Sequence, residues 1–92
     1  MKTKIFDLSG NLIVEIEAKR LDMADMSNLD LRNADLRGLD LSYVDFTDAD
    51  LTGADLTGAD VSCADITDDQ IDSAITDETT YLPVKRHFPA YM

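Results

Sequence analysis

Hydrophobic residues recur every five positions through the middle of this chain. Aligned in fives from Ala24, residues 24–68 read ADMSN LDLRN ADLRG LDLSY VDFTD ADLTG ADLTG ADVSC ADITD. Every block has an aliphatic first residue, aspartate second, an apolar third residue, and serine, threonine or arginine fourth. A period of five matches neither the 3.6-residue period of a helix nor the two-residue period of a strand. The pattern therefore predicts a chain that turns a corner every five residues.

The two apolar places in each block define the predicted core. The third residue is expected to point inward as the main filler, and the first residue to point inward where space is tighter. Glycine, asparagine or aspartate fills seven of the nine fifth places, which suits a corner with positive φ. The third-place residues are Met26, Leu31, Leu36, Leu41, Phe46, Leu51, Leu56, Val61 and Ile66.

This pattern resembles the pentapeptide-repeat family, whose repeat is written A(D/N)LXX. The resemblance implies an all-β solenoid, a right-handed quadrilateral β-helix with one pentapeptide per side and four sides per coil. Residues 19–73 would supply about 2.75 coils. Coils of this kind are expected to stack at the β spacing of roughly 4.8 Å, so that residues twenty apart lie one above the other.

We expect residues 1–92 to form a single domain with a cap at each end. Residues 1–18 are predicted to be an N-terminal β-hairpin, with apolar and polar residues alternating at 4–8 and 12–17 around Ser9-Gly10-Asn11.

A short helix is predicted at residues 68–76, after which residues 77–92 form a C-terminal tail. Thr67 and Gln70 have the spacing of a capping box, which marks the start of a helix. Ile71, Ala74 and Ile75 would lie on its inner side. Such a helix would cover the exposed sheet edge of the last coil.

Charge narrows the classes of partner. The net charge is −11, and it is unevenly spread, because residues 1–37 hold six basic and seven acidic residues whereas residues 38–84 hold twelve acidic residues and no basic one. Such a surface repels nucleic acid and anionic lipid and attracts basic protein surfaces. We therefore expect no direct nucleic-acid or membrane binding, and a monomer or weak dimer.

The residues that carry catalysis are missing from the sequence. His87 is the only histidine and Cys63 the only cysteine, so neither a histidine-based triad nor a histidine metal cluster can be assembled. We predict no catalytic residue, no metal site and no cofactor; stacked carboxylates that hold a hard cation are the weaker alternative. A lone thiol and the lack of a signal peptide or membrane helix favour the cytoplasm of a bacterium, with a phage as the other possible source.

The nine second-place aspartates allow two interpretations. They either fill a turn position that takes any short polar residue, or they are selected for charge. Stacked at ~4.8 Å, two carboxylates repel by roughly 0.9 kcal/mol in water, a cost that asparagine would avoid. Such crowding should raise their pKa values, so that mild acidification or added salt stabilises the fold.

One side of the coil is the predicted partner-binding surface. Blocks twenty apart place Asp25, Asp45, Asp48, Asp65 and Asp68 on a side without lysine or arginine, whereas the other sides carry Arg32, Arg37, or Lys19 with Arg20. Asp50 and Asp69 would extend this surface around a corner. Tyr43 would add an aromatic anchor, with an ordinary exposed tyrosine as the alternative.

Some proteins of the resembled family imitate duplex DNA and occupy the DNA-binding surface of DNA gyrase. Four aspartates per coil would give roughly one charge per 1.2 Å, against about 1.7 Å in duplex DNA. The predicted function is therefore a non-enzymatic, compact duplex-DNA mimic that inhibits a DNA-binding protein. Its length of roughly 13 Å imitates about four base pairs, which favours a restriction enzyme or a CRISPR effector over a topoisomerase. The alternative is a general interaction module or scaffold without mimicry.

Overall fold

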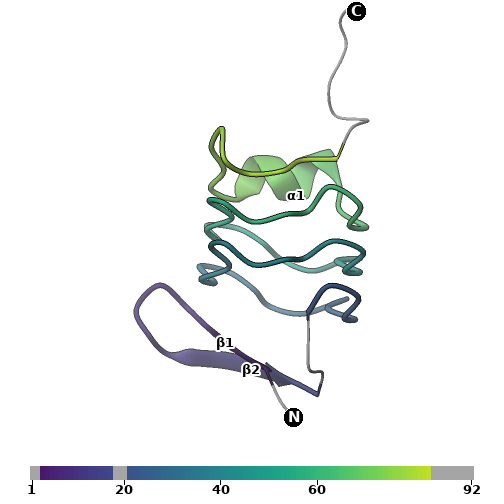
Figure 1. Cartoon of the computed structure of the whole chain (residues 1–92). Helices are drawn as coiled ribbons and strands as arrows, with labels where there is room; N and C mark the ends of the chain where they lie inside the picture. Colours follow the sequence, from purple (N-terminus) through teal and green to yellow (C-terminus); the bar gives the residue numbers. More distant parts are fainter. Residues whose placement is uncertain (1–2, 18–20, 84–92) are drawn as a thin grey trace, which may run out of the picture.

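The computed structural model describes residues 3–17 and 21–83, and within them the chain forms a stack of layers (Figure 1). A hairpin of β1 (Thr3–Phe6) and β2 (Leu12–Ile16) lies at the N-terminal end of the stack. The short helix α1 (Asp68–Ser73) lies across the other end. The repeat blocks make up the layers between these two caps.

Residues twenty apart in the repeats pair with one another in parallel. The Met26 amide donates to the Asp45 carbonyl at 2.9 Å, and the Asp45 amide donates to the Ala24 carbonyl at 3.1 Å. Within the described residues the only regular strands are β1 and β2, because a block that turns after five residues has room for one bridging residue. The prediction that residues twenty apart stack is confirmed by the parallel bridges Asp25–Asp45, Asp30–Asp50, Asp35–Asp55, Asp40–Asp60 and Asp45–Asp65.

The core lies inside these layers and is built as the pattern predicts. All nine third-place residues are buried, and Phe46 is the largest of the fully buried side chains. The first places are also buried, except that Leu29 and Leu39 are only partly so. Full burial of one such large apolar side chain contributes about 1.5–3 kcal/mol relative to exposure, so the stacked filler column accounts for much of the stability.

The chain turns its corners at the fifth places, and each fifth place from Asn28 to Gly58 has a positive φ. Glycine reaches this region without steric cost, and at Gly53 it also leaves room for the layer below. A Cβ added at Gly53 would come within 2.3 Å of Asn33 Oδ1. Tyr43 holds the same conformation, with φ of 66°, although a bulky side chain is strained there.

The hairpin covers one side of the first layer. Its strands are antiparallel, with Ile5 opposite Val14, and each ends before the predicted boundary. The Asp35 amide donates to the Phe6 carbonyl at 2.8 Å. The Leu8 amide donates to the Asn33 carbonyl, also at 2.8 Å, so the chain after β1 pairs with the lower edge of the repeats.

At the opposite end, α1 begins at the predicted capping box but ends early. The Thr67 hydroxyl accepts from the Gln70 amide, and the Gln70 side chain accepts from the Thr67 amide. The helix stops at Ser73 rather than at residue 76, because Ala74 is extended (φ −91°, ψ 169°) and Ile75 returns to pair with Asp55. The placement of Ile75 on the inner side was therefore wrong, and its side chain is 48% exposed.

The last described segment continues the stack with a changed spacing. Tyr81 pairs with Asp60, an offset of twenty-one residues rather than twenty. Thr80 is buried, and its hydroxyl donates to the Leu56 carbonyl at 2.9 Å. The rest of the predicted tail, residues 84–92 with His87, lies outside the described residues, as do Lys19 and Arg20.

Candidate interaction surface

Second-place aspartates form columns on the outside of the stack. Asp25, Asp45 and Asp65 bridge one to the next and form one continuous column. The other three columns contain two aspartates each, Asp30–Asp50, Asp35–Asp55 and Asp40–Asp60. The sequence pattern predicted these columns, and their backbone pairing fixes their order along the stack.

The second-place aspartates from Asp25 to Asp60 are each held by the residue two positions later. Asp25 Oδ1 accepts from the Ser27 amide at 3.0 Å and from the Ser27 hydroxyl at 2.6 Å. Asp45 is bound in the same way by Thr47. The amide bond recurs at every second place up to Asp60, whereas at Asp65 the Thr67 amide donates to Gln70 instead. The carboxylates from Asp25 to Asp60 are therefore fixed in orientation by local turns.

Sequence reasoning missed the residues that supply these bonds. The constant serine, threonine or arginine at the fourth place was visible, and each of these side chains is a hydrogen-bond donor. Its role is to orient the aspartate two residues earlier. This arrangement also gives a structural reason for aspartate at the second place, because one carboxylate oxygen accepts two hydrogen bonds in most blocks.

At Asp25, Asp30, Asp35 and Asp50, hydrogen bonding overturns the expectation that crowding raises the carboxylate pKa values. The hydroxyl and amide of Ser27 lower the pKa of Asp25, and those of Thr52 lower the pKa of Asp50. The Arg32 side chain lowers the pKa of Asp30 to about 2. Direct bonds to the charged form act at 2.5–3 Å, whereas the neighbouring carboxylates are screened by water.

We consequently expect the opposite direction for the effect of pH on stability. A folded-state pKa below the ordinary value of 3.8 favours the folded state above that value. This contribution is lost as the pH falls through the folded-state pKa, near 2 for Asp30. We expect the melting temperature to fall on acidification from pH 5 to about pH 2. A melting temperature that rises over this range would show that repulsion between the columns dominates.

One arginine offsets part of the negative charge in each of two columns. Arg32 binds Asp30 at 2.8 Å and reaches Asp50 at 4.0 Å, and Arg37 binds Asp35 at 2.8 Å. Exposed pairs of this kind add little stability, but they reduce the local negative charge. The blocks that contain Asp25, Asp45 and Asp65 hold no lysine or arginine, so this column keeps its charge.

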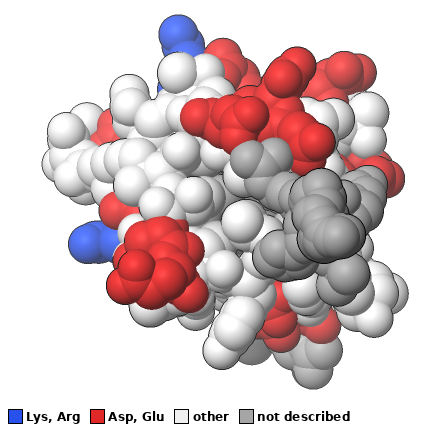
Figure 2. Space-filling model, turned by 90° about the horizontal axis from the view of Figure 1, so that it is seen from above, with Lys and Arg blue, Asp and Glu red and all other residues white. Residues whose placement is uncertain are grey.

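The start of α1 gathers further carboxylates beside that column. Asp48, Asp65 and Asp68 line a shallow depression of about 370 Å³. Asp48 also borders a second depression of about 340 Å³, together with Asp50 and Asp69. Figure 2, which looks down on the α1 end, shows red carboxylates in separate groups near the rim, with uncharged residues between them.

The structure thus brings six of the eight predicted partner-binding residues together. Asp45 joins Asp65 by their backbone bridge, and Asp48, Asp50, Asp68 and Asp69 surround the helix start. Asp25 is at the far end of the column, joined to the group through Asp45. We name the set Asp25, Asp45, Asp48, Asp65 and Asp68 the acidic face.

Tyr43 stands apart from this group, at the corner before the block of Asp45. It is 63% exposed. A hydrogen bond with the side chain of Cys63, which is twenty residues further on, raises the pKa of Tyr43. Tyr43 is therefore an exposed aromatic side chain at a corner with a strained backbone.

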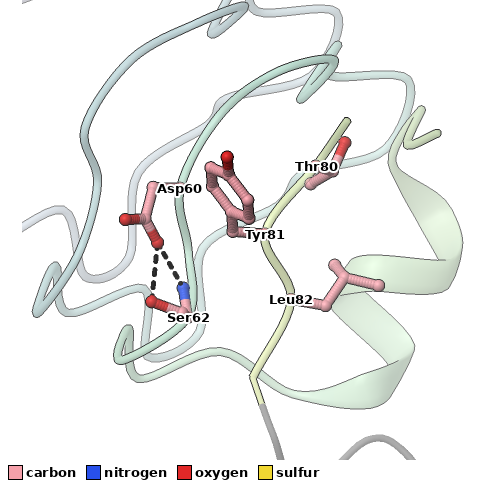
Figure 3. Close-up of a pocket in the computed structure, with 5 residues that line it drawn as sticks. All are labelled: Asp60, Ser62, Thr80, Tyr81 and Leu82. Carbon is pink, nitrogen blue, oxygen red and sulfur yellow. Dashed lines mark hydrogen bonds between the residues drawn. The ribbon is translucent and has the colours of Figure 1, made fainter. Parts of the chain in front are cut away.

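A further depression, beside the last described segment, contains no catalytic arrangement. It measures about 450 Å³ and is lined by Asp60, Ser62, Thr80, Tyr81 and Leu82 (Figure 3). Asp60 accepts from the amide and hydroxyl of Ser62, at 3.0 and 2.7 Å. Within residues 3–17 and 21–83 no three histidine, cysteine, aspartate or glutamate side chains are grouped to hold a metal ion.

None of the helices in the described part of the chain has the length and hydrophobicity needed to span a membrane.

Neither a curated protein nor a solved structure matches the chain. The family model for pentapeptide repeats matches residues 36–68, in eight copies. Proteins with these repeats form right-handed β-helices and are generally structural or binding proteins, often of other proteins. Residues 36–68 are therefore pentapeptide repeats, and the resemblance seen in the sequence is confirmed.

Proposed function

We propose that this protein is a non-enzymatic inhibitor that presents its acidic face to the basic surface of a DNA-binding protein, as a compact mimic of duplex DNA. The observation that supports this most is the regular column of Asp25, Asp45 and Asp65, with no lysine or arginine in its blocks. A backbone-paired column repeats charge at the β spacing of roughly 4.8 Å. A protein surface that binds the phosphates of duplex DNA should also bind such a regular array of negative charges.

Persistent ionisation supports the same proposal. A phosphate mimic must stay charged at neutral pH and next to other anions. The hydrogen bonds from Ser27 lower the pKa of Asp25, and those from Thr52 lower the pKa of Asp50. Local turns also hold the carboxylates of Asp25 and Asp45 in fixed directions, so less side-chain entropy is lost when a partner binds.

Tyr43 belongs to this proposal as an anchor at the edge of the acidic face. Its φ of 66° is costly for a large side chain, and strained residues cluster at functional sites. Asp50 and Asp69 extend the face past the helix start. The partner envisaged reads a short duplex element, as a restriction enzyme or a CRISPR effector does, in the cytoplasm.

The proposal includes the number of sides and coils in the repeats. We take the repeats as a quadrilateral helix with four sides per coil and about 2.75 coils over residues 19–73. Residues 1–92 then form one domain between the hairpin and α1. This length allows contact over about four base pairs of a duplex-binding groove.

A second candidate is an interaction module or scaffold without mimicry. One observation favours it, namely that the aspartates have a structural task as acceptors for the fourth-place donors. In that case the acidity keeps the protein soluble, and the partner contacts other features. The two candidates differ in how binding depends on salt and on the acidic face.

Capture of partners from a bacterial lysate separates them. The face variant changes Asp25, Asp45, Asp48, Asp65 and Asp68 to asparagine, which can still accept the turn hydrogen bonds. A control variant changes Asp30, Asp35, Asp40, Asp55 and Asp60 to asparagine and so removes the same charge from the other columns.

The mimic predicts a DNA-binding protein that the wild type and the control variant retain at low salt. The face variant should lose it, and raised salt should release it, because screening weakens exposed charge contacts. A partner that both variants retain at high salt would favour the scaffold. Equal loss in both variants would show that net charge, not the acidic face, is responsible.

A further inference from the structure

The outward face of the hairpin differs in character from the rest of the surface. In the register of the two strands, Lys4 lies opposite Glu15 and Phe6 lies opposite Leu12. Phe6, Leu8 and Leu12 are 42%, 46% and 50% exposed, so three large apolar side chains gather at this end. The two charged residues cancel, which leaves a neutral, apolar patch on a strongly acidic protein.

A β-bulge produces this patch. Ile5 pairs with Val14, but the next pair is Phe6 with Leu12, so one residue of β2 is skipped. Strict alternation from Val14 would turn Leu12 to the inner face, beside Val14. The extra residue turns Leu12 outward, opposite Phe6. Bulges that redirect an apolar side chain into water cost stability unless something covers it.

Charge indicates what covers this face. Residues 1–37 have a net charge of −1, whereas residues 38–84 have a net charge of −12. Two copies that approach through their repeat faces repel each other, but two that approach through their hairpins meet at their nearly neutral ends. Lys4 and Glu15 also allow each face to pair with an identical one, since a two-fold axis brings unlike charges together.

We propose that two copies of this chain associate through the outward faces of their hairpins, with Phe6, Leu8 and Leu12 at the centre of the contact. Within the described residues, β2 forms no bridge on the edge away from β1, so in each copy this edge of β2 can extend the sheet. The dimer leaves the acidic face of each copy uncovered, because that face runs along the side of the repeats. The proposed dimer does not depend on the proposed inhibitory function.

Sedimentation equilibrium of the full chain over micromolar to millimolar concentration tests the proposal. The wild type should show a concentration-dependent dimer that persists or strengthens as salt is added, because salt screens repulsion between the acidic bodies. Leu12→Asp should abolish it over the same range by placing a charge in the contact. Ile75→Asp is the matched control, since Ile75 is 48% exposed and stands where other blocks carry aspartate.

The control should dimerise like the wild type. Leu12→Thr, which favours a strand and adds no charge, tests the same contact if the aspartate variant does not fold. A wild type that stays monomeric up to millimolar concentration would overturn the proposal. So would a dimer that survives both Leu12 substitutions, or one that Ile75→Asp removes.

Discussion

Replacing Phe46 with alanine should lower the free energy of unfolding by about 3–5 kcal/mol. Phe46 is fully buried and fills the third place of its block, between the layers of Met26 and Ile66. Removing its ring leaves a cavity that the neighbouring layers cannot close, since their backbones are paired at fixed spacing. A domain of this size has about 5–15 kcal/mol of total stability, so the loss is a large share of it. Urea denaturation followed by circular dichroism measures the effect.

Tyr81→Ala is the control for that substitution. Tyr81 is also aromatic but 65% exposed, and substitutions at such positions usually change stability by about 0.5 kcal/mol or less. If the two variants lost equal stability, the third places would not be the core. Equal m-values for wild type and both variants would show that the loss comes from the folded state.

Gln70→Glu should destabilise the protein by about 2–4 kcal/mol, although glutamate normally suits this position of a capping box. The Gln70 side-chain amide donates to the carbonyls of Phe46 and Ala49, at 2.6 and 2.9 Å. A carboxylate can still accept from the Thr67 amide, but it cannot donate to either carbonyl. The Phe46 carbonyl then keeps only the Ala49 amide as donor, the Ala49 carbonyl loses the Gln70 amide, and both oxygens face a negative charge.

The loss should shrink as the pH falls, which makes this prediction specific. The two carbonyls disfavour the charged form, so the pKa of the introduced carboxyl should be raised in the folded state. A raised folded-state pKa means that folding takes up a proton, and stability returns on acidification relative to the wild type. Ile75→Asp adds a charge at the same end without touching these carbonyls. A Gln70→Glu variant as stable as the wild type at neutral pH would contradict the role assigned to α1.

The repeats were the most predictable part of this molecule. A five-residue period constrains every block in the same way, so Leu36 or Phe46 could be placed in the core from spacing alone. The stacking of Asp25 on Asp45 followed from the twenty-residue return, and Thr67 with Gln70 marked the helix start. Local signals that repeat, or that have fixed spacing, survive into the fold because nothing in the tertiary structure competes with them.

Features that depend on the contact between segments were less predictable. The helix ends at Ser73 because Ile75 pairs with Asp55, an interaction between residues twenty apart that helical periodicity does not reveal. The bulge that turns Leu12 outward breaks the strict alternation from which the hairpin was predicted. The predicted direction of the pKa shift was wrong for Asp25 and Asp50, because repulsion was considered without the hydrogen bonds from Ser27 and Thr52.

The partner-binding role of the aspartates is the central claim, and competition by duplex DNA tests it most directly. The partner captured by the wild-type protein is titrated with a short DNA duplex, and the fraction still bound is measured. If the acidic face occupies a duplex-binding groove, the DNA should displace the protein completely and competitively. A partner that binds DNA and this protein at the same time, with neither weakening the other, would contradict the claim.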